Sequence, residues 1–80
     1  MNRHERQARI DLGMTADALM TNPAFAAAVE KYRAELFHDW KAATELVVRE
    51  RLWLESQALE GVMARLSALR LAGDVARSRT

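Results

Sequence analysis

The stretch from Glu45 to Ala72 carries more apolar surface than one small fold needs. One set of apolar residues recurs at the spacing of a single helical face. Its members are Val48, Leu52, Leu59, Val62, Leu66 and Leu69. A second line runs beside it, formed by Val47, Leu54, Ala58, Gly61, Ala68 and Ala72, and Trp53 lies on a third flank. Because one neighbouring helix covers one stripe, two stripes predict two neighbours. In a chain of 80 residues, we expect some of these neighbours to come from other copies.

Composition supports this expectation. Half of the 80 residues are hydrophobic, which is too many for a disordered chain, and the length allows one domain, residues 1–80. A core of this size contributes only roughly 3–5 kcal/mol of net stability. With no cysteine, disulfides and thiolate zinc sites are excluded. Oligomerisation is then the common remaining route to stability.

Three helical segments are predicted, and no strand pattern competes with them. The first covers residues 1–21, where Gly13 and a possible N-cap at Thr15 favour a split into two pieces. Asn22-Pro23 predicts the start of a second helix, over residues 23–43. Its apolar face would contain Phe25, Val29, Tyr32, Leu36 and Trp40. A long helix over residues 45–72 follows, Gly73 is expected to end it, and residues 73–80 form a basic, mobile tail.

The junction between the second and third helices has two interpretations, because glycine and proline are absent from Ala24 to Glu60. One is a continuous helix of about 50 residues. The other is a tight turn near residues 42–45, with Thr44 capping the next helix. An isolated long helix exposes too much apolar surface, so the turn is favoured. The sequence predicts an all-α fold: an antiparallel helical hairpin with an additional N-terminal helical segment, oligomerising through the long C-terminal helix.

Catalytic and metal motifs are weak. Glu35 and His38 have the Glu-x-x-His spacing of carboxylate-bridged metal bundles, but they adjoin an aromatic helix face. A Ser/His/Asp arrangement, a nucleophilic cysteine and a phosphate-binding glycine loop are all missing. We therefore expect no enzymatic activity, cofactor or metal.

Two features bear on nucleic acids. Trp40 and Trp53 could stack on bases, but both follow leucines at helical spacing, which favours packing or interface roles. The C-terminal segment has a net charge of +3, from four arginines and Asp74. These arginines either bind phosphates or complement the helix dipole. They are Arg65, Arg70, Arg77 and Arg79.

Targeting signals are not evident. The longest apolar run, Ala24 to Val29, is far shorter than the roughly 20 residues that span a bilayer. The first residues, MNRHERQARID, lack the apolar core of a signal peptide. A cytoplasmic protein without membrane contact is expected.

The order of features resembles a group of small helical proteins. Asn22-Pro23-x-Phe25 is followed by Trp40 at a helix end, and then by Arg49-Glu50-Arg51-Leu52-Trp53 opening a longer helix. Over about residues 20–75, this order resembles short helical proteins from the head and packaging genes of tailed phages. It is also similar to the small terminase subunits of gene transfer agents.

The resemblance implies helical hairpins that assemble into a ring, which hands DNA to a large terminase or regulates it. Many small terminases carry an N-terminal helix-turn-helix, which this sequence lacks, so specific DNA recognition is not implied. Packing and assembly would fall to Leu52, Trp53, Leu59, Val62, Leu66 and Leu69. The four arginines would contact DNA weakly and without sequence preference. The alternative is a small helical adaptor or regulator that binds a dedicated protein partner through an amphipathic helix, without DNA.

Overall fold

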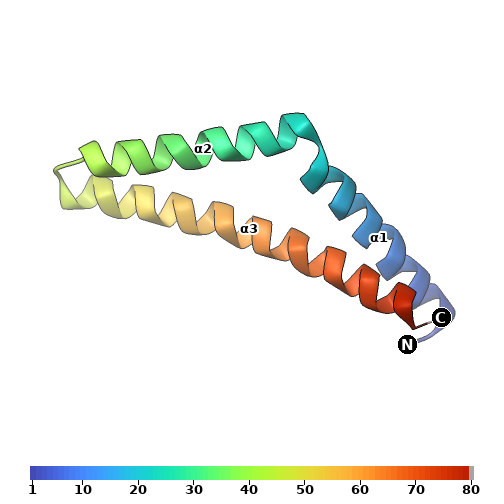
Figure 1. Cartoon of the computed structure of the whole chain (residues 1–80). Helices are drawn as coiled ribbons and strands as arrows, with labels where there is room; N and C mark the ends of the chain where they lie inside the picture. Colours follow the sequence, from blue (N-terminus) through green and yellow to red (C-terminus); the bar gives the residue numbers. More distant parts are fainter. Residues whose placement is uncertain (80) are drawn as a thin grey trace.

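The computed structural model describes residues 1–79, which form three α-helices (Figure 1). Helix α1 covers Arg3–Thr21, α2 covers Pro23–Ala42, and α3 covers Leu46–Ser78. The predicted all-α class is therefore confirmed. Thr80, part of the predicted tail, lies outside the described residues.

Asn22 separates α1 from α2 and caps both. Its backbone N–H donates to the Leu19 carbonyl at 3.1 Å, and its side chain accepts from the Phe25 N–H at 3.0 Å. Its extended backbone, with ψ of 123°, breaks the helix, and Pro23 starts the next one with a suitable φ. This boundary agrees with the prediction from Asn22-Pro23.

The turn between α2 and α3 is also present, at residues 43–45. Ala43 and Glu45 both have extended backbone, which reverses the chain. The N-cap of α3 is Glu45, without a side-chain hydrogen bond, so the predicted cap at Thr44 is wrong. The hairpin between α2 and α3 thus depends on packing along its length more than on local capping.

The predicted helix break at Gly13 and the predicted helix end at Gly73 are both wrong, and the same contact explains both errors. Helix α1 runs without interruption through Gly13, and α3 continues past Gly73 to Ser78. These two glycines lie where α1 crosses α3. A Cβ on Gly13 would lie 2.8 Å from the Gly73 Cα, and a Cβ on Gly73 would lie 2.9 Å from the Gly13 Cα. Glycine is required here for close backbone approach, so residues 73–78 are helix and not a tail.

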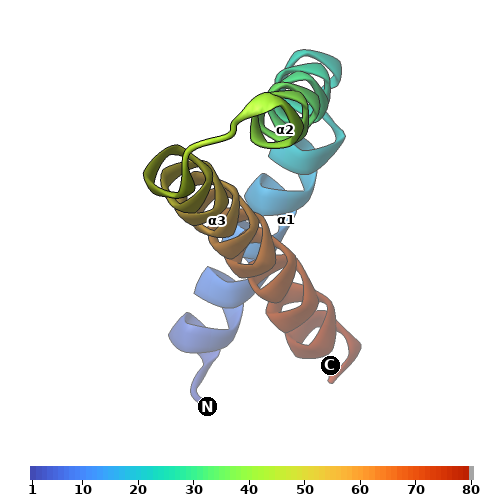
Figure 2. The ribbon, with the colours of Figure 1, turned by 90° about the vertical axis from the view of Figure 1, so that its left-hand side faces the viewer.

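Each part of α3 has its own neighbour. Figures 1 and 2 show α2 running antiparallel to the first half of α3, while α1 crosses the second half, so that the start of α1 and the end of α3 lie at the same end of the molecule. Helix α1 packs on α3 more extensively than α2 does. The N-terminal segment, which the sequence alone does not place, is therefore the main partner of the C-terminal half of α3.

The buried core is small and the molecule is elongated. Its buried apolar side chains are Ala16, Val29, Leu36, Leu52 and Ala76. The radius of gyration is 16.9 Å, against about 12 Å expected for a compact chain of this length. Extents of 54 × 25 × 15 Å leave long helix faces uncovered within residues 1–79.

Candidate functional site

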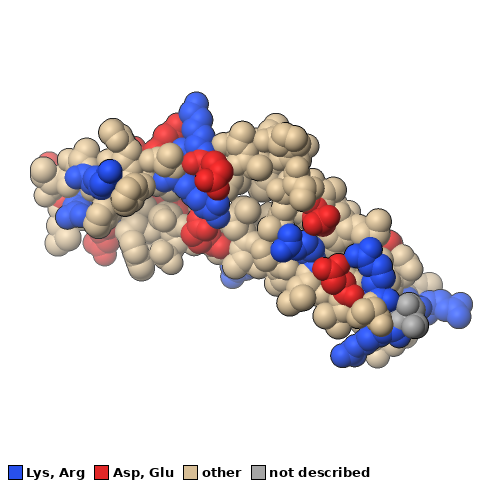
Figure 3. All heavy atoms as spheres, viewed as in Figure 1, with Lys and Arg blue, Asp and Glu red and all other residues tan. Residues whose placement is uncertain are grey.

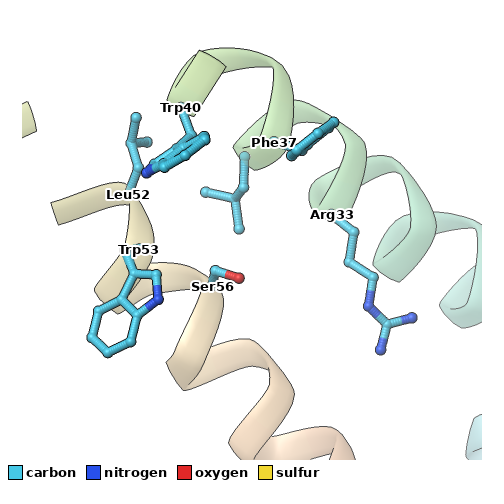
Figure 4. A pocket seen from close by; sticks show the side chains of 7 residues that line it. Arg33, Phe37, Trp40, Leu52, Trp53 and Ser56 are labelled. Carbon is cyan, nitrogen blue, oxygen red and sulfur yellow. The ribbon is translucent and has the colours of Figure 1, made fainter. Parts of the chain in front are cut away.

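An apolar groove opens between α2 and α3 near the turn that joins them (Figure 4). Phe37 and Trp40 come from α2, and Trp53 comes from α3. Their exposed fractions are 60%, 37% and 54%, which are high for large aromatic side chains. We call this 220 Å³ depression the aromatic groove. Its lining consists of Arg33, Leu36, Phe37, Trp40, Leu52, Trp53 and Ser56.

Cations from the protein lie against the aromatic rings. The Arg49 guanidinium is 3.9 Å from the centroid of the Trp40 ring, and the Lys41 ammonium is 4.6 Å from that of Phe37. Such cation–π contacts fix the ring orientations. The Arg49 Nε is buried and lacks a hydrogen-bond partner within the described residues. Trp40 is therefore held in place, whereas the surface of Trp53 stays open.

The other end of the groove is polar. Arg33 donates from Nε and Nη2 to the two carboxylate oxygens of Glu60, at 2.8 and 2.7 Å, and from Nη1 to Glu30 at 2.9 Å. The two bonds to Glu60 join α2 to α3, whereas the bond to Glu30 lies within α2. Hydrogen bonding from Arg33 lowers the pKa of the Glu60 carboxyl below its ordinary value of 4.5, and the same bonds raise the pKa of Arg33. Glu60, whose side chain is 46% exposed, is thus one half of an interhelical ion pair.

A second acidic residue on α3 also contacts α2. The Tyr32 hydroxyl donates to the Glu55 carboxylate at 3.3 Å. Desolvation and the negative charge of Glu55 raise the pKa of Tyr32. Glu55 and Glu60 of α3 therefore both bond side chains of α2 across the hairpin.

The predicted packing residues divide into two groups. Leu52 is buried against α2, and Leu59, Leu66 and Leu69 are half-buried along the inner side of α3. Val62 and Trp53 are more than half exposed, although Val62 shares the helix face of Leu66 and Leu69. Most residues of the first stripe are thus at least partly covered by the chain's own helices.

Most of the second apolar line faces solvent, and only Gly61 and Ala72 in it are half-buried. Val47 is 76% exposed and Leu54 is 55% exposed, and Ala58 and Ala68 are also exposed. A Cβ added at Gly61 would meet no backbone of another helix among residues 1–79, so the close approach predicted along this line is not found at Gly61 within them. The close approach instead involves Gly13 with Ala16 and Gly73 with Ala76.

Three of the four predicted DNA-contact arginines have partners within the chain. Arg65 donates to the Gly61 carbonyl at 2.9 Å, Arg70 lies 3.8 Å from Asp17, and Arg77 bonds Asp74 at 2.8 Å. Arg79 is exposed at the end of α3 and lines a groove with Arg9. Interactions with nearby acidic residues and with the negative end of the α3 dipole therefore explain part of this positive charge without a nucleic-acid ligand.

The fold brings further arginines to the same end. Because α1 begins beside the end of α3, positive side chains from both helices gather there (Figure 3). Residues 1–12 add three arginines against two acids, whereas residues 13–64 carry eight acids against five bases. We call this region the basic end. It contains Arg3, Arg6, Arg9, Arg70, Arg77 and Arg79.

Within residues 1–79, no three His, Asp or Glu side chains lie close enough together to hold a metal ion. Glu35 and His38 therefore belong to no such group among these residues. Over the same residues, every helix falls short of the length and apolarity needed to cross a membrane.

Sequence reasoning missed the α1–α3 crossing. The sequence has a Gly-x-x-Ala pattern three times, at Gly13–Ala16, Gly61–Ala64 and Gly73–Ala76, and the first and third meet at the crossing, so the pattern alone does not identify the pair. Small residues three apart share one helix face and allow close packing.

Comparisons of the chain with protein-family models, with curated proteins and with solved structures find no match.

Proposed function

We propose that this protein is a non-enzymatic subunit of a helical assembly and that it acts by self-association through the uncovered faces of α3. The supporting observation is the amount of large apolar side-chain surface left on the outside. Leu46, Val47 and Leu71 are 79%, 76% and 63% exposed, although they belong to one continuous helix. Large apolar side chains are thus exposed near both ends of α3, and exposed apolar surface is where protein interfaces form.

The surface area supports the same proposal. The chain exposes 6149 Å², whereas a compact monomer of 9.1 kDa exposes about 4,900 Å². The excess of about 1,250 Å² exceeds the roughly 800 Å² that one partner contributes to a standard interface. One standard interface per subunit would therefore cover about two thirds of this excess.

Light scattering during size-exclusion chromatography at micromolar concentration tests this proposal. Wild type should run as a dimer or larger species. Leu54→Glu should shift it to monomer, because a charge would enter the exposed apolar line. Ala34→Glu, at an exposed position of α2, is the matched control and should leave the size unchanged. A wild-type monomer would refute self-association.

The aromatic groove favours a second candidate, an adaptor that binds an apolar side chain of a dedicated protein partner. Exposed Phe37 and Trp53 flank a depression with one guanidinium at its polar end, as in a groove that receives a partner's hydrophobic anchor. Trp53→Ser should abolish capture of such a partner from the native host without loss of helix content. An identical set of captured proteins for wild type and variant would remove the groove from consideration.

The basic end supports a nucleic-acid role within this assembly, as the resemblance to small terminase subunits implies. Its net positive charge would bind phosphates without reading sequence. Affinity for duplex DNA should fall steeply with added salt, and Arg77→Ala combined with Arg79→Ala should weaken it. Equal affinity of this double variant and wild type would contradict DNA contact at the basic end. Packaging-motor genes beside this gene would support the terminase role specifically.

A further inference from the structure

The outward side of α3 has a regular and symmetric pattern. Val47, Leu54, Gly61, Ala68 and Val75 follow one another at intervals of seven residues. We call these five residues the outer face of α3. A seven-residue repeat is the spacing by which one helix stays in contact with another along its length. Along the first half of α3 the outer face has no such neighbour within the described residues, because Val47 and Leu54 are 76% and 55% exposed. In the second half, Ala68 and Val75 line a groove with Met1 and Arg9, and Val75 is still 42% exposed.

Gly61 lies at the centre of this face, and its chain gives no reason for a glycine. A Cβ built on Gly61 would meet only the Nη1 of Arg65, at 3.1 Å, which is the far end of a flexible side chain. Gly13 and Gly73, by contrast, would each place a Cβ against backbone. Since glycine destabilises a helix interior relative to alanine, Gly61 is explained by a backbone that approaches from outside the chain.

The charges on α3 select the direction of that backbone. Residues 45–60 carry four acids against two bases, whereas residues 65–79 carry four arginines against one acid. Two parallel copies of α3 would bring the positive halves together and the negative halves together. Two antiparallel copies would place each negative half against a positive half, which is the favourable arrangement.

We infer that α3 pairs in an antiparallel manner with α3 of a second copy along the outer face, with Gly61 of both copies at a two-fold axis. This inference rests on the proposed self-association and specifies its interface. In this register, Leu54 lies against the partner's Ala68, and Val47 lies against the partner's Val75. Large residues therefore meet small or medium ones, and the two glycines meet each other. A two-fold contact of this kind closes on itself as a dimer.

Cysteine cross-linking tests the register directly, because the natural chain has no cysteine. Leu54→Cys and Ala68→Cys each replace an exposed residue of the outer face. In the antiparallel pair, two copies of either variant hold their thiols about 21 Å apart, which is 14 helical residues. A disulfide requires Cα atoms within about 7 Å. An equimolar mixture of the two variants should therefore cross-link under mild oxidation, and neither variant alone should do so.

The matched control mixes Ala68→Cys with Ala34→Cys, whose cysteine lies at an exposed position of α2. Cross-linking of Leu54→Cys alone as strongly as in the mixture would overturn the antiparallel register. A mixture that cross-links no more than the control would overturn the outer face as the interface. Light scattering on the same samples separates the two proposals: a dimer would leave self-association standing through another surface, and a monomer would refute both.

Gly61→Ala tests the position of the axis. Two added methyl groups would enter the closest contact of the dimer, so the dissociation constant should rise about tenfold or more. Circular dichroism of dilute protein should show equal or higher helix content, because alanine favours the helix. Unchanged or tighter dimerisation of this variant would overturn the placement of Gly61 at the axis.

Discussion

Substitution of Gly13 by alanine is the sharpest test of how α1 packs on α3. The new Cβ would lie 2.8 Å from the Gly73 Cα and 2.9 Å from the Leu69 carbonyl oxygen. Both are backbone atoms of a helix, so neither can rotate away. Carbon atoms normally stay about 3.5–4.0 Å apart. The helices must therefore separate by roughly 1 Å at their crossing, which loosens the packing of buried Ala16 and Ala76.

The expected loss of stability follows from two opposing terms. Alanine at a helix interior stabilises by up to about 1 kcal/mol relative to glycine. Overpacking costs about 1–3 kcal/mol. We expect Gly13→Ala to lower the free energy of unfolding by about 1–2 kcal/mol and Tm by roughly 5–15 °C for a chain of this size. Gly61→Ala is the matched control, because only the end of the Arg65 side chain is near.

Urea and thermal unfolding followed by circular dichroism at monomeric concentration measure both variants. Gly61→Ala should raise the free energy of unfolding by about 0.5–1 kcal/mol, whereas Gly13→Ala should lower it. Gly73→Ala should resemble Gly13→Ala, and the double variant should lose less than the sum of the two, because one contact is broken in both. A stabilised Gly13→Ala would refute the close crossing of α1 and α3.

Three further substitutions test separate parts of the fold. Leu52→Ala removes a side chain that is 7% exposed and should destabilise by about 2–5 kcal/mol in urea unfolding; a loss below 1 kcal/mol would contradict its burial. Asn22→Ala removes the side-chain cap of α2 and should cost about 0.5–2 kcal/mol, whereas Asn22→Ser should restore most of it. The Glu60 pKa is lowered when folded, so its pairing with Arg33 stabilises above pH 4.5, and this contribution is lost as pH falls through the lowered pKa. Glu60→Gln should flatten this acid-side loss in the urea midpoint, and an unchanged pH profile would contradict the ion pair.

Local signals in the sequence were reliable where one residue decides the backbone. Proline has a fixed φ and asparagine can cap a helix, so the boundary between Asn22 and Pro23 was predictable. The turn at residues 43–45 was favoured only indirectly, from the apolar surface that a continuous helix would expose. Its cap at Thr44 was mispredicted, because the local sequence carries little information there.

Glycine was the main source of error. The same residue type ends helices and permits helices to touch, and a single sequence does not separate the two uses. Gly73 was assigned to a helix end, although it lies inside α3 against Gly13. The contact joins residues 60 positions apart, so only the tertiary structure reveals it.

The candidate surfaces were partly predictable. The exposed line containing Val47 and Leu54 followed from the excess of apolar residues at helical spacing, and Trp53 was recognised as surplus to one stripe. The aromatic groove was not predictable, because it needs Phe37 and Trp40 beside Trp53 across the hairpin. The basic end likewise depends on the return of α1 to the end of α3.

The sequence by itself determined that this chain is helical, that it turns at two places, and that one long helix has more apolar surface than its own neighbours cover. Periodicity and capping depend on residues that are close together in the chain, so both can be read from the sequence alone. Only the tertiary structure decided which stripe is covered, because that depends on where α1 and α2 lie against α3. The side of α3 that contains Leu52 is covered by neighbouring helices, whereas much of the line that passes through Gly61 stays exposed.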